Sequence, residues 1–217
     1  MRRGVLGIDA AWTEAAPSGV AWLVEDTRGW RIAACAPSYS EFLARAEGVE
    51  VDWSISKKVS GEWPDIAALL SAAQRIESAE PVVVAVDMPL STGLCVSRRE
   101  ADNRISSVFG AKGCSTHSPT PDRPGEMGAD LMCQLDAAGF PLATMDAAVS
   151  LKPKGCRALE VYPHPALLRL LNAPYRLPYK VSRSSQFWKG ESVSARIGRL
   201  LEVFQHCLLY TSDAADE

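Results

Sequence analysis

Two stretches of the chain decide the fold: GVLGIDAAW at residues 4–12 and PVVVAVDMP at residues 81–89. Each is a short apolar run, which is typical of a strand in the middle of a sheet with both faces covered. The first run ends at Asp9, and the second ends at Asp87 before a proline stops it. The sequence therefore predicts two central strands, each with a carboxylate at its C-terminal end.

The segments between these strands predict how the two ends meet. Residues 20–25 (VAWLVE) and 30–36 (WRIAACA) have the composition of strands and are joined by a short turn, so the first three strands form an antiparallel meander. A helix over residues 62–79 follows, with a proline in its first turn. Because such crossovers are right-handed, the strand ending at Asp87 can lie parallel to the strand ending at Asp9 and directly beside it. Both carboxylates are then expected at the edge where open α/β sheets bind ligands.

The rest of the chain contributes weaker elements. Residues 39–47 predict a short helix capped by Ser40, and residues 157–162 predict a strand followed by a helix. Further helices are expected at residues 97–105, 127–138 and 191–205. This order of three antiparallel strands, helix, parallel strand, insertion, strand and helix resembles the RNase H-like fold. We therefore expect an α/β protein with a mixed sheet flanked by helices.

The expected domain organisation is simple. Residues 1–205 form one domain, and the Gly-, Pro- and Ser-rich residues at about 91–150 form an irregular insertion. The last helix has apolar residues at helical spacing that are expected to pack on the sheet: Val193, Ile197, Leu200, Leu201 and Phe204. This pattern stops after Gln205, so residues 206–217 are expected to be a non-native or truncated tail. We expect residues 208–217 to be disordered or loosely packed.

Composition excludes several classes of protein. The chain of 217 residues is 47% hydrophobic and 23% charged, which is ordinary for a globular protein. No apolar run is long enough for a transmembrane helix, and the N-terminus does not have the pattern of a signal peptide. The six cysteines show no CxxC spacing, which favours reduced thiols over disulfides or a zinc ribbon. A soluble, cytoplasmic protein is expected.

Charge is unevenly distributed along the chain. The net charge is −3, but residues 152–199 hold ten basic residues against two acidic ones, a local charge of +8. A basic segment on an acidic body indicates a side that faces a polyanion, so a nucleic-acid partner is expected. The alternative is an ordinary solvated helix face and loop.

The two aspartates carry the expected chemistry. Two carboxylates side by side repel each other unless a cation lies between them. Mg²⁺ or Mn²⁺ prefers oxygen ligands and keeps several waters, and a metal pair can activate water for attack on a phosphodiester. The alternative is that Asp9 and Asp87 each accept hydrogen bonds from loop amides.

Two further candidates lie near residue 160. Glu160 is within the predicted strand 157–162 and is the third candidate metal ligand and catalytic carboxylate. His164 follows the strand, where its imidazole could ligate a metal, act as a general acid or base, or contact phosphate. A histidine in a proline-flanked turn is more often structural.

Basic side chains are the candidate substrate contacts. We expect phosphate binding by the following residues: Arg98, Arg99, Arg104, Lys152, Lys154 and Arg157. The alternative for the arginines of the insertion is a face of Arg/Asp ion pairs. The chain has no GxxxxGK[ST] loop, no GxGxxG after a strand and no GxSxG elbow, which excludes the usual nucleotide-cradling and serine-nucleophile motifs.

Four motifs in order resemble those of the domain of unknown function 429 family: GIDAAW (7–12), AVDMPLS (85–91), RREAD-R (98–104) and EVYPHPAL (160–167). The resemblance spans roughly residues 4–205. It implies an RNase H-like fold and a metal-dependent nuclease, with Asp9, Asp87 and Glu160 as site positions. The family pattern usually continues beyond the point where this chain ends.

Two other functions remain open from the sequence. A degenerate RNase H-like module could bind nucleic acid or a protein without turnover. An actin-like phosphotransferase also begins with a strand that ends in aspartate, but it normally has two such domains and glycine-rich phosphate loops. The substrate, DNA or RNA, and the oligomeric state do not follow from the sequence.

Overall fold

The computed structural model describes residues 2–52, 59–143 and 155–213, and for residues 208–213 it describes the backbone alone. The chain forms two compact units. The first comprises Met1–Arg99 and Ser118–Val161, and the second comprises Glu100–His117 and Tyr162–Glu217. The insertion expected at residues 91–150 is thus divided between the two units.

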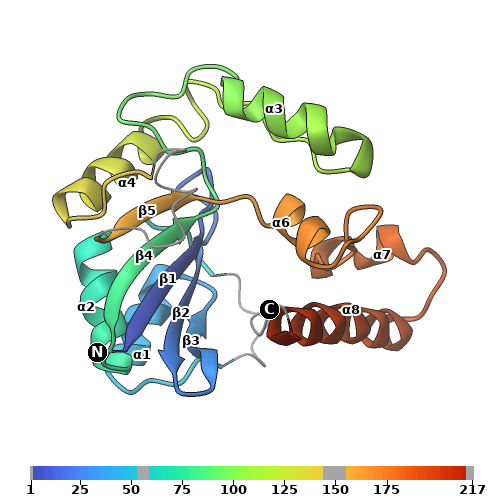
Figure 1. Cartoon of the computed structure of the whole chain (residues 1–217), viewed down its shortest axis with the longest axis horizontal. Helices are drawn as coiled ribbons and strands as arrows, with labels where there is room; N and C mark the ends of the chain where they lie inside the picture. Colours follow the sequence, from blue (N-terminus) through green and yellow to red (C-terminus); the bar gives the residue numbers. More distant parts are fainter. Residues whose placement is uncertain (1, 53–58, 144–154, 214–217) are drawn as a thin grey trace. The chain divides into compact units, whose positions relative to one another are not determined.

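The first unit is built on a five-stranded sheet. Its strands are β1 (Arg3–Asp9), β2 (Gly19–Asp26), β3 (Gly29–Ala36), β4 (Glu80–Val86) and β5 (Arg157–Glu160). Their order in the sheet is β3-β2-β1-β4-β5, as Figure 1 shows. The pairs β3–β2 and β2–β1 are antiparallel, whereas β1–β4 and β4–β5 are parallel. This mixed sheet confirms the predicted α/β class and is consistent with an RNase H-like fold.

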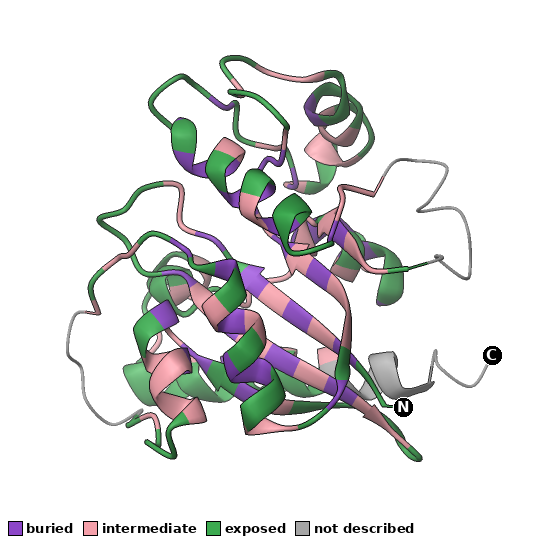
Figure 2. Ribbon diagram, turned by 90° about the vertical axis from the view of Figure 1, so that its left-hand side faces the viewer, coloured by how far each residue is buried: buried purple, intermediate pink, exposed green. Residues whose placement is uncertain are grey.

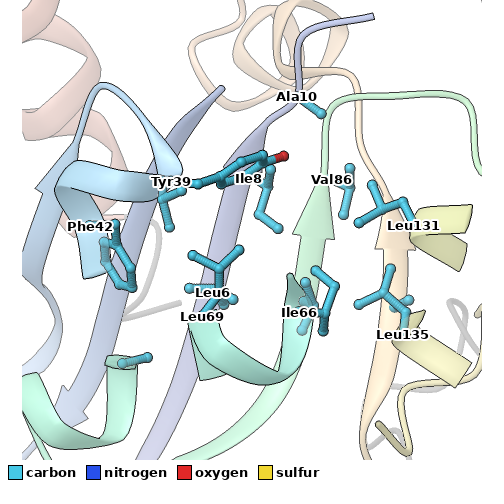
Figure 3. Close-up of a cluster of buried hydrophobic side chains, with 14 of the residues drawn as sticks. Leu6, Ile8, Ala10, Tyr39, Phe42, Ile66, Leu69, Val86, Leu131 and Leu135 are labelled. Atoms are coloured by element: carbon cyan, nitrogen blue, oxygen red, sulfur yellow. The ribbon is translucent and has the colours of Figure 1, made fainter. Parts of the chain in front are cut away.

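One face of the sheet carries the core. Burial alternates along the strands, visible in Figure 2 as bands of purple and pink. On β1, Leu6 and Ile8 are buried while Val5 and Gly7 are partly exposed. Apolar side chains from three helices pack on the buried face (Figure 3): α1 (Tyr39–Ala46), α2 (Ile66–Ile76) and α4 (Glu126–Ala137). The apolar periodicity of the sequence therefore corresponds to a helix layer on this side of the sheet.

Two of these helices begin at side-chain caps. The side chains of Ser38 and Asp65 each accept a hydrogen bond from the backbone N–H three residues later, at 3.2 Å and 2.9 Å. The prediction of Ser40 as a cap is wrong, because the extended residue before α1 is Ser38 and Ser40 lies inside the helix. Pro64 precedes the cap of α2 instead of lying in its first turn, so α2 begins later than predicted.

The second unit is helical within the part of the chain that is described. Its elements are α3 (Glu100–Phe109), the 3-10 turn η1 (Gly110–Lys112), α6 (Pro163–Leu170), the 3-10 turn η2 (Val181–Arg183), α7 (Ser184–Phe187) and α8 (Val193–Asp213). The helix expected at residues 97–105 starts at Glu100. Arg98 and Arg99 therefore precede it and belong to the first unit.

The last helix, α8, differs from its prediction in two ways. Its backbone stays helical to Asp213 instead of ending at Gln205, because residues 206–213 contain no Gly or Pro and a formed helix extends at little cost. Among the apolar residues expected to pack on the sheet, Leu200 is buried, but the others are exposed: Val193, Ile197, Leu201 and Phe204. The described neighbours of α8 include α6 and α7 of its own unit. Like the other helices in the described ranges, α8 is not apolar enough over its length to cross a membrane.

Candidate functional site

Asp9 and Asp87 lie at adjacent strand ends. Asp9 is the last residue of β1, and Asp87 directly follows β4. The parallel register pairs Ile8 with Val86, and the backbone N–H of Asp87 donates to the Ile8 carbonyl oxygen at 2.9 Å. The prediction that the two strands are parallel neighbours is confirmed. Neighbouring strands are about 4.8 Å apart, so the backbones of Asp9 and Asp87 lie close together at this edge of the sheet.

The two aspartates also share a face of the sheet. Alternation places both opposite the buried side chains of Ile8 and Val86, on the face that carries Gly7 and Ala85. Asp9 is exposed, and no hydrogen bond or ion pair engages its carboxylate among the described residues. Asp87 is partly buried. The pair can therefore present oxygen ligands to a hydrated cation.

A buried tyrosine lies beside Asp9. Tyr39, the first residue of α1, is 4% exposed, and its ring lies across the end of β1 in Figure 3. Burial raises the pKa of Tyr39; its hydrogen bond with Ser18 lowers that pKa, and the charge of Asp9 raises it. Ser18 is buried too, and its hydroxyl oxygen accepts a hydrogen bond from the N–H of Ala11 at 3.0 Å. Tyr39 and Ser18 therefore hold the loop that follows Asp9.

Sequence reasoning missed Tyr39 and Ser18. Neither lies in a motif, and both lie outside the predicted strands. The available signal was their polarity next to a predicted strand end, which many loop residues share. Their role depends on a contact between α1 and the loop after β1, and no local pattern encodes that contact.

Glu160 is held by other residues of the first unit. Its register partner is Val86, so alternation places it on the face opposite Asp9 and Asp87. Arg99 binds it with two hydrogen bonds, Nη1 to Oε2 at 2.7 Å and Nη2 to Oε1 at 2.6 Å. The backbone N–H of Leu90 also donates to Oε2, at 2.9 Å. Glu160 thus joins the end of β5 to the segment that follows Asp87, and it forms an ion pair with one of the predicted phosphate ligands.

We predict that this connection stabilises the first unit. Glu160→Ala should lower the free energy of unfolding by about 2–3 kcal/mol, because the buried Leu90 N–H and the Arg99 guanidinium both lose their acceptor. Glu160→Gln should cost only about 1 kcal/mol, since an amide oxygen can still accept from Leu90. Urea unfolding measures both values.

The matched control for this prediction is Glu100→Gln. Glu100 pairs with Arg104 at 2.8 Å on the exposed side of α3, where ion pairs contribute less than about 0.5 kcal/mol. Equal losses in Glu160→Ala and Glu100→Gln would contradict a structural role for Glu160.

The other predicted phosphate ligands that the structure describes each have a different partner. Arg98 donates to the Ser118 hydroxyl at 3.2 Å, and Arg104 is in the exposed ion pair with Glu100. Arg157, on β5, donates to the carbonyl oxygen of Cys156 at 2.8 Å. Lys152 and Lys154 lie outside the described residues. Arg99 and Arg104 are thus in ion pairs with Glu160 and Glu100, whereas the alternative considered from the sequence named aspartates.

His164 belongs to the second unit. It is the second residue of α6 and only 5% exposed. Burial, and to a smaller extent the positive charges of Arg176, Lys180 and Arg183, together lower its pKa to about 4. Its imidazole is therefore neutral at pH 7 and cannot act as a cationic acid there. Arg104 is the other predicted site residue in this unit.

The described side chains do not form a metal site with three or more protein ligands. Among them, no three His, Cys, Asp or Glu residues are close enough together to hold an ion. One reason is that Glu160 lies on the face of the sheet opposite Asp9 and Asp87, where it binds Arg99. Asp9 and Asp87 are two carboxylates at adjacent strand ends, and Mg²⁺ is commonly bound by one or two carboxylates with waters completing its shell.

Comparison with known proteins gives one match. A family model described as "Protein of unknown function (DUF429)" matches residues 7–206. No curated protein and no solved structure matches the chain. The matched range includes both aspartates and all four motifs whose resemblance was noted in the sequence. The chain belongs to the DUF429 family.

Proposed function

We propose that this protein is a divalent-metal-dependent phosphodiesterase that acts on nucleic acid, with Asp9 and Asp87 as the ligands of Mg²⁺ or Mn²⁺. The observation that carries the proposal is the parallel pairing of β1 and β4, which brings two carboxylates to adjacent ends of the sheet on one face. Two carboxylates so close repel each other, and a cation between them removes that repulsion.

The bound cation would activate a water for attack on the phosphodiester. The residues of this chain would hold the cation in position. Asp9 and Asp87 supply oxygen ligands, and the Ser18–Tyr39 contact fixes the loop after Asp9. Glu160 would orient Asp87, because its hydrogen bonds with Leu90 and Arg99 fix the segment that follows Asp87. In this role Glu160 needs no direct contact with the ion.

A nucleic-acid substrate is supported by charge. The excess of basic residues over 152–199 would neutralise backbone phosphates, and each neutralised phosphate releases counterions. Binding should therefore weaken steeply as salt rises. A DNA or RNA preference would have to come from contacts to the sugar or the bases.

The test is a cleavage assay with a panel of single- and double-stranded DNA and RNA. We expect cleavage with Mn²⁺ or Mg²⁺, none with EDTA, and inhibition by added salt. Absence of cleavage of every substrate with either metal would contradict the proposed activity.

A second candidate is a binding module without turnover. The specific observation that favours it is that the described side chains offer two carboxylates and no third ligand. In this case nucleic acid should bind with the same salt dependence, and Mn²⁺ should bind without any cleavage.

A further inference from the structure

The second unit contains a buried imidazole with an unusual environment. His164 is 5% exposed, and its Nε2 atom lies 2.5 Å from Nη2 of Arg176. The ring centroid of Tyr179 is 4.8 Å from that of the imidazole. The Tyr162 ring packs edge-on against the imidazole, with the two centroids 5.7 Å apart. His164 therefore contacts two aromatic rings and has one nitrogen on an arginine.

The contact with Arg176 determines where the imidazole proton is. A guanidinium has only donors, so Nε2 of the neutral ring must accept and the proton must be on Nδ1. Nδ1 is buried and has no hydrogen-bond partner among the described residues. Buried donors in native proteins are nearly always paired, so this polar environment is unusual for a protein interior.

Three positive charges gather at this ring. Arg176 is hydrogen-bonded to the imidazole, and Lys180 directly follows Tyr179, whose ring packs on that imidazole. The backbone N–H of Arg183 donates to the Lys180 carbonyl oxygen at 3.0 Å. The charges of these three basic residues each lower the pKa of His164. Lys180 and Arg183 are exposed, while Arg176 is partly buried. The backbone N–H of Arg176 donates to the Lys112 carbonyl at 2.9 Å, which fixes the arginine against η1. The cluster therefore combines a fixed inner cation with two accessible ones.

No carboxylate balances these charges in the part of the chain that is described. The Arg176 side chain contacts His164 and the carbonyl oxygen of Gly113 at 3.4 Å, and neither Lys180 nor Arg183 is in an ion pair there. The sequence between Glu160 and Glu191 contains five basic residues and no acidic one. Like charges held together without a counter-charge repel each other, and a bound anion removes that repulsion.

We infer that Arg176, Lys180 and Arg183, assembled around His164, form a binding site for a phosphate group. Phosphate fits because it carries up to two negative charges and accepts several hydrogen bonds at once, which matches three cationic donors. Lys180 and Arg183 contact the phosphate from the exposed side, and His164 holds Arg176 in position behind them. The site lies in the second unit, and the inference does not rest on a metal at Asp9 and Asp87.

The experiment is an NMR titration of the full chain with inorganic phosphate at constant ionic strength, with chloride as the comparison anion. Constant ionic strength removes general screening as a cause of the shifts. We expect saturable shifts at Arg176, Lys180 and Arg183 with phosphate and none with chloride. Shifts that do not saturate, or that chloride reproduces, would overturn the inference.

Three variants localise the binding. Lys180→Ala and Arg183→Ala should each weaken phosphate affinity about five- to ten-fold, since each removes a charged donor. Both side chains are exposed, so the fold should survive. The matched control is Lys189→Ala, an exposed lysine of the same basic segment, which should change the affinity less than about two-fold. An equal loss in all three variants would show a diffuse charge effect and overturn the site.

Two further experiments identify the source of the phosphate and test whether phosphate binding is independent of Asp9 and Asp87. If the site takes a terminal phosphate, inorganic phosphate should displace a 5′-phosphorylated oligonucleotide and leave a 5′-hydroxyl one bound. If it takes backbone phosphates, both should be displaced. The double variant Asp9→Asn/Asp87→Asn should bind phosphate like the unmodified chain. Loss of phosphate binding in that variant would overturn the assignment to the second unit.

Discussion

Asparagine in place of Asp9 or Asp87 is expected to lower metal-dependent cleavage about a hundred-fold or more. Even residues that merely orient metal ligands typically change metal affinity or activity by 10- to 100-fold, and a direct ligand should matter at least as much. Each substitution removes a negative charge that holds the ion and keeps the size of the side chain. Initial cleavage rates at saturating Mn²⁺ measure the effect.

The matched control is Asp136→Asn, an exposed aspartate at the end of α4 in the same unit, which should cleave like the unmodified chain. The fold of each variant is checked by circular dichroism. Undiminished cleavage by either the Asp9 or the Asp87 variant would mean that the activity comes from another site or from a contaminating nuclease.

Removal of the Trp22 side chain should have the largest effect on stability. Trp22 is fully buried on β2, and its indole N–H donates to the Glu77 carbonyl oxygen at 3.1 Å. Its ring fills the space above Gly4, where an added Cβ would lie 1.9 Å from the ring. We expect Trp22→Ala to lower the free energy of unfolding by about 3–5 kcal/mol, measured by urea unfolding.

Two variants keep this prediction testable. Trp22→Phe retains most of the apolar contact and should cost less, so it provides a value if Trp22→Ala fails to fold. Trp30→Ala is the control, because Trp30 on β3 is 46% exposed and should contribute less than about 1 kcal/mol. A loss at Trp22 no greater than that at Trp30 would contradict the described core.

The central strands could be predicted because their signals are local. Unbroken apolar runs that end at Asp9 and Asp87 indicated buried strands, and the right-handed crossover rule left few ways to arrange them. The helix near residues 127–138 was also predictable from its composition and is α4. That the strand ends carrying Asp9 and Asp87 are adjacent therefore followed from the sequence.

The surroundings of the site depend on contacts distant in sequence. Glu160 meets Arg99 across 61 residues, and Tyr39 meets Ser18 through the placing of α1 against the loop after β1. The periodicity of a strand predicts the face on which Glu160 lies, but it does not predict which basic side chain binds Glu160 there. The end of α8 differs from its prediction for another reason. Loss of the apolar pattern marks the end of packing, whereas a helical backbone can continue past it.

The central claim is that Asp9 and Asp87 share one divalent cation. The most direct test is a crystal of the full chain soaked in Mn²⁺, with the ion located by its anomalous scattering. We predict an anomalous peak bound by carboxylate oxygens of both residues at about 2.0–2.6 Å, the range of oxygen distances for such ions. A peak at another site, or none beside the two aspartates at saturating Mn²⁺, would contradict the claim.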